Sequence, residues 1–199
     1  MRTLRGLLSY LRRPPQRPFR ATVNSAKVDT MSETVAEHRR QSPQAVACAV
    51  ITVSDTRTLE TDRGGPLVVE LLEAAGHHCV SRQIVPDDAA FIRALVQGLA
   101  SRGDIDAILL TGGTGIAQRD QTFETISSLL TKTMPGYGEL FRMLSFQEIG
   151  PAAMLSRAIG GLCGRTLVLT MPGSPAAVRL AMEKLIGPEL GHLVREARR

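Results

Sequence analysis

The sequence lacks tryptophan, and tyrosine and phenylalanine bring its aromatic content to only 4%. Surfaces that bind single-stranded nucleic acid combine aromatic platforms with clustered lysine and arginine. The chain also lacks an apolar run near the ~20 residues that a membrane-spanning helix needs. We therefore expect no nucleic-acid partner and no membrane span, although the 199 residues carry a net charge of +5.

The excess of positive charge lies in the first 30 residues, which hold seven basic residues against Asp29. We expect residues 1–44 to be a basic, proline-containing, disordered leader. Residues 45–199, which are close to neutral, should form one folded domain. The arginine-rich start resembles a transit peptide, so organelle targeting is the alternative to a cytoplasmic location.

Cysteine is also scarce: Cys48, Cys79 and Cys163 are odd in number, far apart and free of any CxxC spacing. This excludes a disulfide framework and a zinc site of the usual spacing. We expect three buried thiols in a reducing cytoplasm.

From residue 45 onward, short apolar runs alternate with helical patterns. The runs predict strands over 45–53, 78–85, 107–111 and 166–170. The patterns between them predict helices over 65–75, 88–102, 121–130, 137–149, 152–159 and 175–186, with a break at Gly160-Gly161. The alternation indicates an α/β fold with three layers, a doubly wound and mostly parallel sheet with helices on both faces.

Polar or glycine-rich residues follow every predicted strand. These segments are Ser54-Asp55-Thr56-Arg57, Pro86-Asp87-Asp88, Thr111-Gly112-Gly113-Thr114-Gly115 and Met171-Pro172-Gly173-Ser174-Pro175. In an open parallel sheet, ligands bind outside the carboxyl ends of the strands near a topological switch point. We therefore expect these segments to form one site.

The segment Thr111–Gly115 can bring backbone N–H groups close to an anion such as a phosphate. It is not a Walker A loop, because the lysine is absent, and it lacks the third glycine of a dinucleotide-binding loop. The alternative is a tight strand-to-helix turn without a ligand.

Asp120 follows Gly115 by five residues and allows two interpretations. It could cap the next helix, or it could hold Mg²⁺ beside a phosphate together with Asp87 or Asp55. Because the loop has no lysine, Arg119 or Arg57 would help to offset the phosphate charge.

Taken together, the motifs resemble the MoaB/MogA family of molybdenum cofactor biosynthesis over about residues 46–190. The resemblance rests on Thr111–Gly115 with Asp120, Pro86-Asp87, Pro135-Gly136-Tyr137-Gly138-Glu139, Leu155-Ser156-Arg157 and Met171–Ser174. The stretch Phe141–Gly150 is closer to the MoaB branch.

The resemblance implies a Mg²⁺-dependent enzyme that adenylylates molybdopterin with ATP and releases pyrophosphate. Asp87 and Asp120 match the family's important acidic positions, as catalytic residues and as holders of the magnesium that accompanies ATP. The substrate-binding positions implied by the motifs are Ser54, Asp55, Thr111, Gly112, Gly113, Thr114, Gly115, Gly136, Glu139, Ser156, Gly173 and Ser174.

The family resemblance further implies a homo-oligomer, a trimer or a hexamer, that works with other proteins of the pathway. Within the MoaB branch, the alternative is an oligomeric protein that binds molybdopterin or a nucleotide with little turnover.

Overall fold

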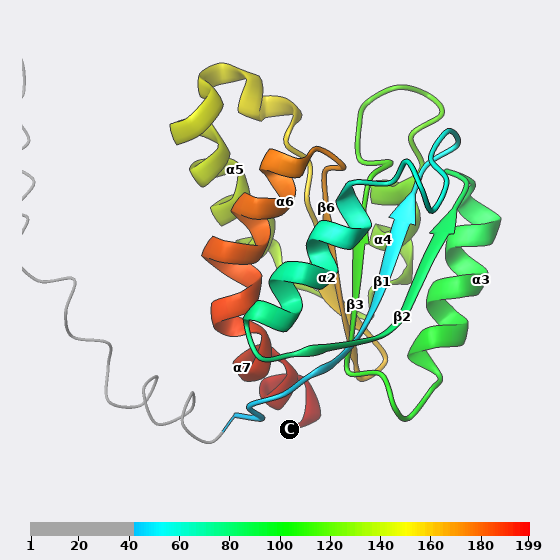
Figure 1. The fold of residues 1–199 in the computed structure, drawn as a ribbon, viewed down its shortest axis with the longest axis vertical. Helices are drawn as coiled ribbons and strands as arrows, with labels where there is room; N and C mark the ends of the chain where they lie inside the picture. The colour runs from blue at the N-terminus through cyan, green and yellow to red at the C-terminus, as the bar shows by residue number, and fades with distance from the viewer. Residues whose placement is uncertain (1–41) are drawn as a thin grey trace, which may run out of the picture.

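The first predicted apolar run forms an inner strand, next to the edge strand of the sheet, in a computed structural model that describes residues 42–199. Six strands form one sheet in the order β2-β1-β3-β6-β5-β4 (Figure 1). Their bounds are β1 Ala47–Val53, β2 His78–Val85, β3 Ala107–Thr111, β4 Lys132–Thr133, β5 Gly160–Cys163 and β6 Thr166–Met171. The strands β2, β1, β3 and β6 are parallel, whereas β5 and β4 add antiparallel pairs at one edge.

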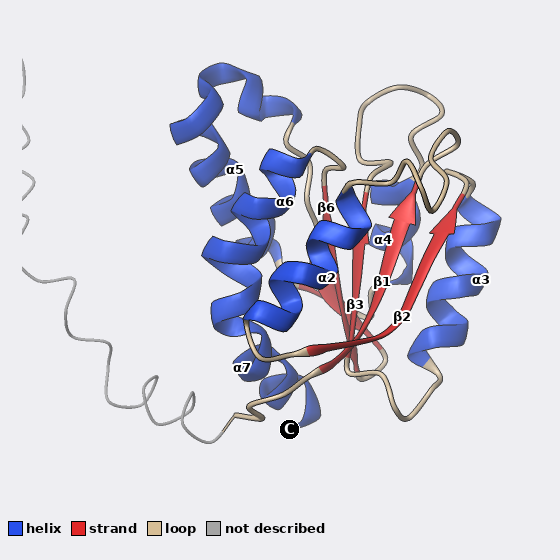
Figure 2. Ribbon diagram, viewed as in Figure 1, coloured by secondary structure: helices blue, strands red, loops and turns tan. Residues whose placement is uncertain are grey.

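Helices cover both faces of this sheet (Figure 2). They are α2 Gly64–Ala74, α3 Ala89–Ala100, α4 Thr122–Leu129, α5 Pro135–Ile149, the 3₁₀ helix η2 Gly150–Leu155, α6 Pro175–Ala181, the π-helical turn η3 Met182–Ile186 and α7 Gly187–Arg198. Helices α2, α5, α6 and α7 pack on one face, and α3 and α4 pack on the other. The predicted three-layer α/β fold is confirmed.

Alternate side chains of β1 enter the two halves of the core. Cys48 and Val50 pack in the layer of α2, whereas Ala49 and Ile51 pack in the layer of α3. All four are essentially inaccessible to solvent. Burial on both faces explains why the strand appears in the sequence as a continuous apolar run rather than as an alternating pattern.

The winding of the chain changes direction between β1 and β3. From β1 the chain passes through α2 on one face to β2, and from β2 through α3 on the other face to β3. Strands β2 and β3 therefore flank β1. This arrangement creates a switch point between the carboxyl ends of β1 and β3, where ligands of such sheets bind.

The antiparallel edge differs from the sequence-based prediction. The predicted helix over 152–159 is wrong in its second half, because η2 ends at Leu155, and the expected break at Gly160-Gly161 begins β5. A Cβ on Gly161 would overlap the Lys132 carbonyl, so glycine permits the close approach of β4 to β5. The two-residue β4 is too short to leave a periodic pattern.

Several expectations concern the N-terminal segment, and for residues 1–41 they lie outside the described residues. In the described part, no helix is long and apolar enough to cross a bilayer. The three cysteines are free, but the prediction of three buried thiols is right only for Cys48, because Cys79 and Cys163 are half-buried. Burial raises the pKa of all three thiols, which keeps them in the unreactive protonated form.

Candidate functional site

A cavity of about 730 Å³ opens in the crevice between the carboxyl ends of β1 and β3. Ser54 follows β1, Thr111 and Gly112 close β3, and Gly173 follows β6, and all four line this cavity. The fold thus brings together predicted site residues from three strand ends. The cavity lies at the switch point, which is the place that the topology favours.

The turn after β3 requires glycine at two consecutive positions. Gly112 has a φ of 101° and Gly113 a φ of 64°, both in the region that favours glycine. A Cβ on Gly112 would overlap the Val53 carbonyl, and one on Gly113 would lie 2.6 Å from Asp87 Oδ2. The N–H groups of residues 113–116 donate to no described residue, so they can receive an anion.

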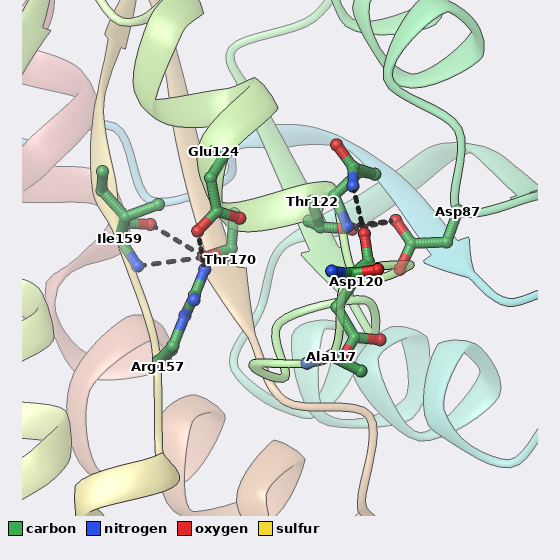
Figure 3. A network of polar contacts seen from close by, with 10 residues as sticks. Asp87, Ala117, Asp120, Thr122, Glu124, Arg157, Ile159 and Thr170 are labelled. Atoms are coloured by element: carbon green, nitrogen blue, oxygen red, sulfur yellow. Dashed lines mark hydrogen bonds and ion pairs between the residues drawn. The ribbon is translucent and has the colours of Figure 1, made fainter.

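Asp87 follows β2 and forms hydrogen bonds to the segments that follow β1 and β3. Figure 3 shows its carboxylate beside Thr122 at the start of α4. Its N–H donates to Asp55 Oδ1 at 2.9 Å. Its Oδ1 accepts the N–H of Gln121 at 3.0 Å and lies 3.4 Å from the Thr122 hydroxyl. Within residues 42–199 no hydrogen bond reaches Oδ2, so this oxygen can bind a ligand.

The pKa of Asp87 is raised above its ordinary value, chiefly because the carboxyl is partly buried. The Gln121 N–H opposes this rise, whereas the negative charges of Asp120 and Asp55 add to it. The ionised carboxylate is therefore held in an unfavourable environment, which a nearby cation would relieve.

Asp120 closes a tight turn behind Gly115. Its Oδ2 accepts the Ala117 N–H at 3.0 Å, and its own N–H donates to the Ala117 carbonyl at 2.9 Å. A Cβ on Gly115 would overlap the Asp120 carboxylate, so the missing side chain allows this contact. In the described chain Asp120 Oδ1 accepts no hydrogen bond.

Asp87 and Asp120 each keep a carboxylate oxygen that accepts no hydrogen bond in the described chain, and such oxygens are the ligand type that Mg²⁺ prefers. Mg²⁺ is usually held by one or two carboxylates and completes its shell with phosphate and water. Across the described residues, no three His, Cys, Asp or Glu side chains converge as a complete set of metal ligands. The donor set therefore suits a shared cation better than a closed protein site.

Asp62 is a cavity residue that the sequence analysis missed. It is only 6% exposed, and its Oδ1 accepts the N–H groups of Gly64 and Gly65 at 3.0 and 3.1 Å. Its Oδ2 accepts the Thr52 hydroxyl at 2.8 Å, which fastens the β1–α2 loop to β1. An aspartate two residues before a helix start is a capping signal that could have identified it.

The β1–α2 loop also brings two arginines, Arg57 and Arg63, to the wall of the same cavity. Arg57 Nη1 donates to the Thr61 carbonyl at 3.3 Å. Neither arginine forms an ion pair with a described residue. Their charge is therefore available to a phosphorylated ligand.

Many predicted site residues do not line the 730 Å³ cavity. Among them are Asp55, Asp87, Gly113, Thr114, Gly115 and Asp120, which lie around the loop beside it. Ser174 caps α6 by accepting the Ala177 N–H, although Gly173 beside it lines the cavity. Gly136 and Glu139 lie on α5 and Ser156 follows η2, and none of the three lines the 730 Å³ cavity. Their role in substrate binding remains a prediction.

Comparison with known proteins gives one consistent result. A family model described as a probable molybdopterin binding domain matches residues 49–192. The Molybdenum cofactor biosynthesis protein B of Halalkalibacterium halodurans is 54% identical over 163 residues, which cover 81% of this chain and 96% of that protein.

The solved structures agree with the sequence comparison. A crystal structure of Molybdenum cofactor biosynthesis protein B has a TM-score of 0.77 at 54% identity and covers 80% of this chain and 99% of that one. A MogA structure has a TM-score of 0.68 at 31% identity, with coverage of 76% and 99%. The expected resemblance to MoaB and MogA, with MoaB the nearer of the two, is confirmed.

Proposed function

The chain belongs to the family of probable molybdopterin-binding domains, and we propose that it adenylylates molybdopterin during molybdenum cofactor biosynthesis. In the proposed reaction an oxygen of the terminal phosphate of molybdopterin attacks the α-phosphorus of ATP, and pyrophosphate leaves. The names of the relatives support the pathway, and the chemistry of the crevice supports the reaction.

One observation carries this proposal: the glycine-rich loop after β3 lies beside the carboxylates of Asp87 and Asp120. In the described chain, the N–H groups of residues 113–116 and one oxygen of each carboxylate form no hydrogen bond. A Cβ added to Gly113 would overlap the Asp87 carboxylate, and one added to Gly115 would overlap the Asp120 carboxylate, so both carboxylates lie close to the loop. Phosphates held on the loop would therefore lie within reach of a cation held by the carboxylates.

The residues present suit a reaction between two phosphorylated molecules. The cavity lining contains no histidine, cysteine or lysine. A phosphate nucleophile is already anionic and needs no strong base, so positioning and charge neutralisation supply the catalysis. Asp87 and Asp120 would hold Mg²⁺, which would offset phosphate charge, while Arg57 and Arg63 on the wall of the 730 Å³ cavity would offset the charge of the molybdopterin phosphate.

The direct test is pyrophosphate release from Mg·ATP in the presence of molybdopterin. We expect Asp120→Asn to lower the rate by about 100-fold or more, because it removes a charge at the reacting phosphates without changing the volume. Asp104→Asn is the matched control, since that carboxylate pairs only with Arg102 among the described side chains.

Equal rates for wild type and Asp120→Asn would contradict the role of Asp120. If the wild type binds molybdopterin but releases no pyrophosphate above the blank, the enzyme proposal fails. The result would then favour the alternative of a binding protein in the same pathway.

A homo-oligomer forms part of the proposal, and an exposed apolar strip supports it. Leu140, Met143, Phe146 and Ile149 follow one another at intervals of three residues, in a strip that winds around half of α5, and they are 47–59% exposed. The strip continues into η2 with exposed Met154 and Leu155. Contiguous apolar surface of this kind marks interaction sites, and a second copy of the chain is the partner that the resemblance implies.

A further inference from the structure

Arg157 has no role in the proposed function so far, yet it contacts the helix that follows the glycine-rich loop. It lies after η2 and reaches across to the first turn of α4 (Figure 3). Its Nη2 donates to Glu124 Oε1 at 2.6 Å. Its Cζ lies 4.2 Å from the centre of the Phe123 ring. These two contacts fix the plane of the guanidinium group.

A second, smaller cavity of about 200 Å³ separates this arginine from the loop. Its lining includes Gly115, Ile116, Asp120, Glu124 and Arg157. Sites for whole cofactors and drug-sized ligands usually have about 300–1,000 Å³. This cavity therefore suits a compact group rather than a whole nucleotide.

The guanidinium group of Arg157 keeps unused hydrogen-bonding capacity. Its side chain is only 21% exposed, and Nε is buried with no partner in the described chain. Nη1 bonds no described residue either, but unlike Nε it is open to solvent. Arginine N–H groups form strong, charge-assisted hydrogen bonds to phosphate oxygens, and here Nη1 is the donor that is open to a ligand. A held guanidinium with a free donor beside a small cavity thus fits an anionic group.

We propose that this cavity binds the diphosphate end of the nucleotide, with Nη1 of Arg157 and the N–H groups of Gly115 and Ile116 as donors. The inference rests on the proposed function. When the new bond to the α-phosphorus forms, the bond from that phosphorus to the bridging oxygen breaks, and its electron pair stays on the leaving pyrophosphate. Arg157 stabilises that negative charge.

The carboxylates of Asp120 and Glu124 share the cavity wall, so the anion should bind as its magnesium complex. The binding of inorganic pyrophosphate to the full chain, measured by calorimetry with and without Mg²⁺, tests the proposal without any need for turnover. We expect Arg157→Met to raise the Kd of magnesium pyrophosphate about 10-fold or more, and Arg157→Lys to raise it less.

Two further variants sharpen the experiment. Glu124→Gln should leave binding equal or tighter, because it removes a negative charge from the cavity wall while its amide oxygen can still accept from Nη2. Arg179→Met is the matched control, since Arg179 forms an exposed ion pair with Glu183 on α6, and it should leave the Kd unchanged. Circular dichroism and thermal unfolding establish that each variant is folded.

The proposal is overturned if folded Arg157→Met or Arg157→Lys binds magnesium pyrophosphate as the wild type does, or if the wild type does not bind it. If the wild type turns over ATP and molybdopterin but Arg157 does not affect pyrophosphate binding, only this inference fails. If Arg157 governs pyrophosphate binding but no turnover occurs, only the proposed reaction fails.

Discussion

The parallel part of the sheet and its antiparallel edge have different tasks in this molecule. Strands β1, β3 and β6 are almost completely buried, and the segments that follow them line the 730 Å³ cavity. The edge strand β4 is exposed, and α5 beside it presents an apolar strip to solvent. The parallel part thus places polar and glycine residues at its strand ends, where a ligand can bind. The antiparallel edge instead offers an apolar surface on which another protein chain can pack.

The two parts should differ most in the stability that each loses when one of its glycines is changed to alanine. Gly112→Ala is expected to lower the free energy of unfolding by more than about 2 kcal/mol, because its φ is positive and the Cβ would overlap the Val53 carbonyl. Gly164, in the turn from β5 to β6, also has a positive φ, but no atom lies within 4 Å of its Cβ position.

Gly164→Ala should therefore cost only about 1 kcal/mol. Urea unfolding at one protein concentration, followed by circular dichroism, measures both variants. Equal losses of stability would contradict the view that the parallel part is the more constrained one.

An intermediate effect is expected for association at the edge. Phe146→Ser should raise the dissociation constant of the oligomer about 10-fold or more, because a buried aromatic side chain contributes about 1.5–3 kcal/mol. Sedimentation velocity over a dilution series measures it. Phe91→Ser is the matched control, since Phe91 is equally exposed but lies on α3. A monomeric wild type, or equal effects of the two changes, would rule out α5 as the interface.

The smallest effect concerns the pH dependence of stability in the parallel part. Because the pKa of Asp87 is raised in the folded state, the unfolded chain loses that proton first as the pH rises above 3.8. The wild type should therefore lose stability relative to Asp87→Asn as the pH rises from 3.8 to the higher pKa of the folded state. Thermal unfolding from acidic to neutral pH measures the difference.

Asp104→Asn provides a control of opposite sign. The hydrogen bond from Arg102 lowers the pKa of Asp104, so the wild type should gain stability relative to this variant as the pH rises. A relative gain for wild-type Asp87 would show that its carboxylate is stabilised, not strained, in the fold.

The sequence predicts the parallel part well because its signals are local. The run Ala107–Thr111 is β3 without a change of boundary, and the polar residues after three strands converge because parallel strands end at one edge. The edge leaves weaker signals, since β4 has two residues and β5 begins with two glycines.

The sequence does not predict which side chains from different segments form contacts with each other. Asp62 matters because it reaches Thr52 on a neighbouring element, and Arg157 matters because it reaches Glu124. A capping position marks Asp62 in the sequence and a family motif includes Arg157, but neither signal identifies the partner that the side chain reaches. Its significance depends on how the loops close, and no spacing rule contains that information.

The contact between Gly113 and Asp87 has a consequence for how this site can change over evolutionary time. The position of a Cβ on Gly113 is occupied by the Asp87 carboxylate and by the Thr122 hydroxyl. No side chain can therefore be gained at 113 while those two groups remain. Positions 87, 113 and 122 are therefore expected to change together. The carboxylate and the hydroxyl must be lost before the glycine can be replaced.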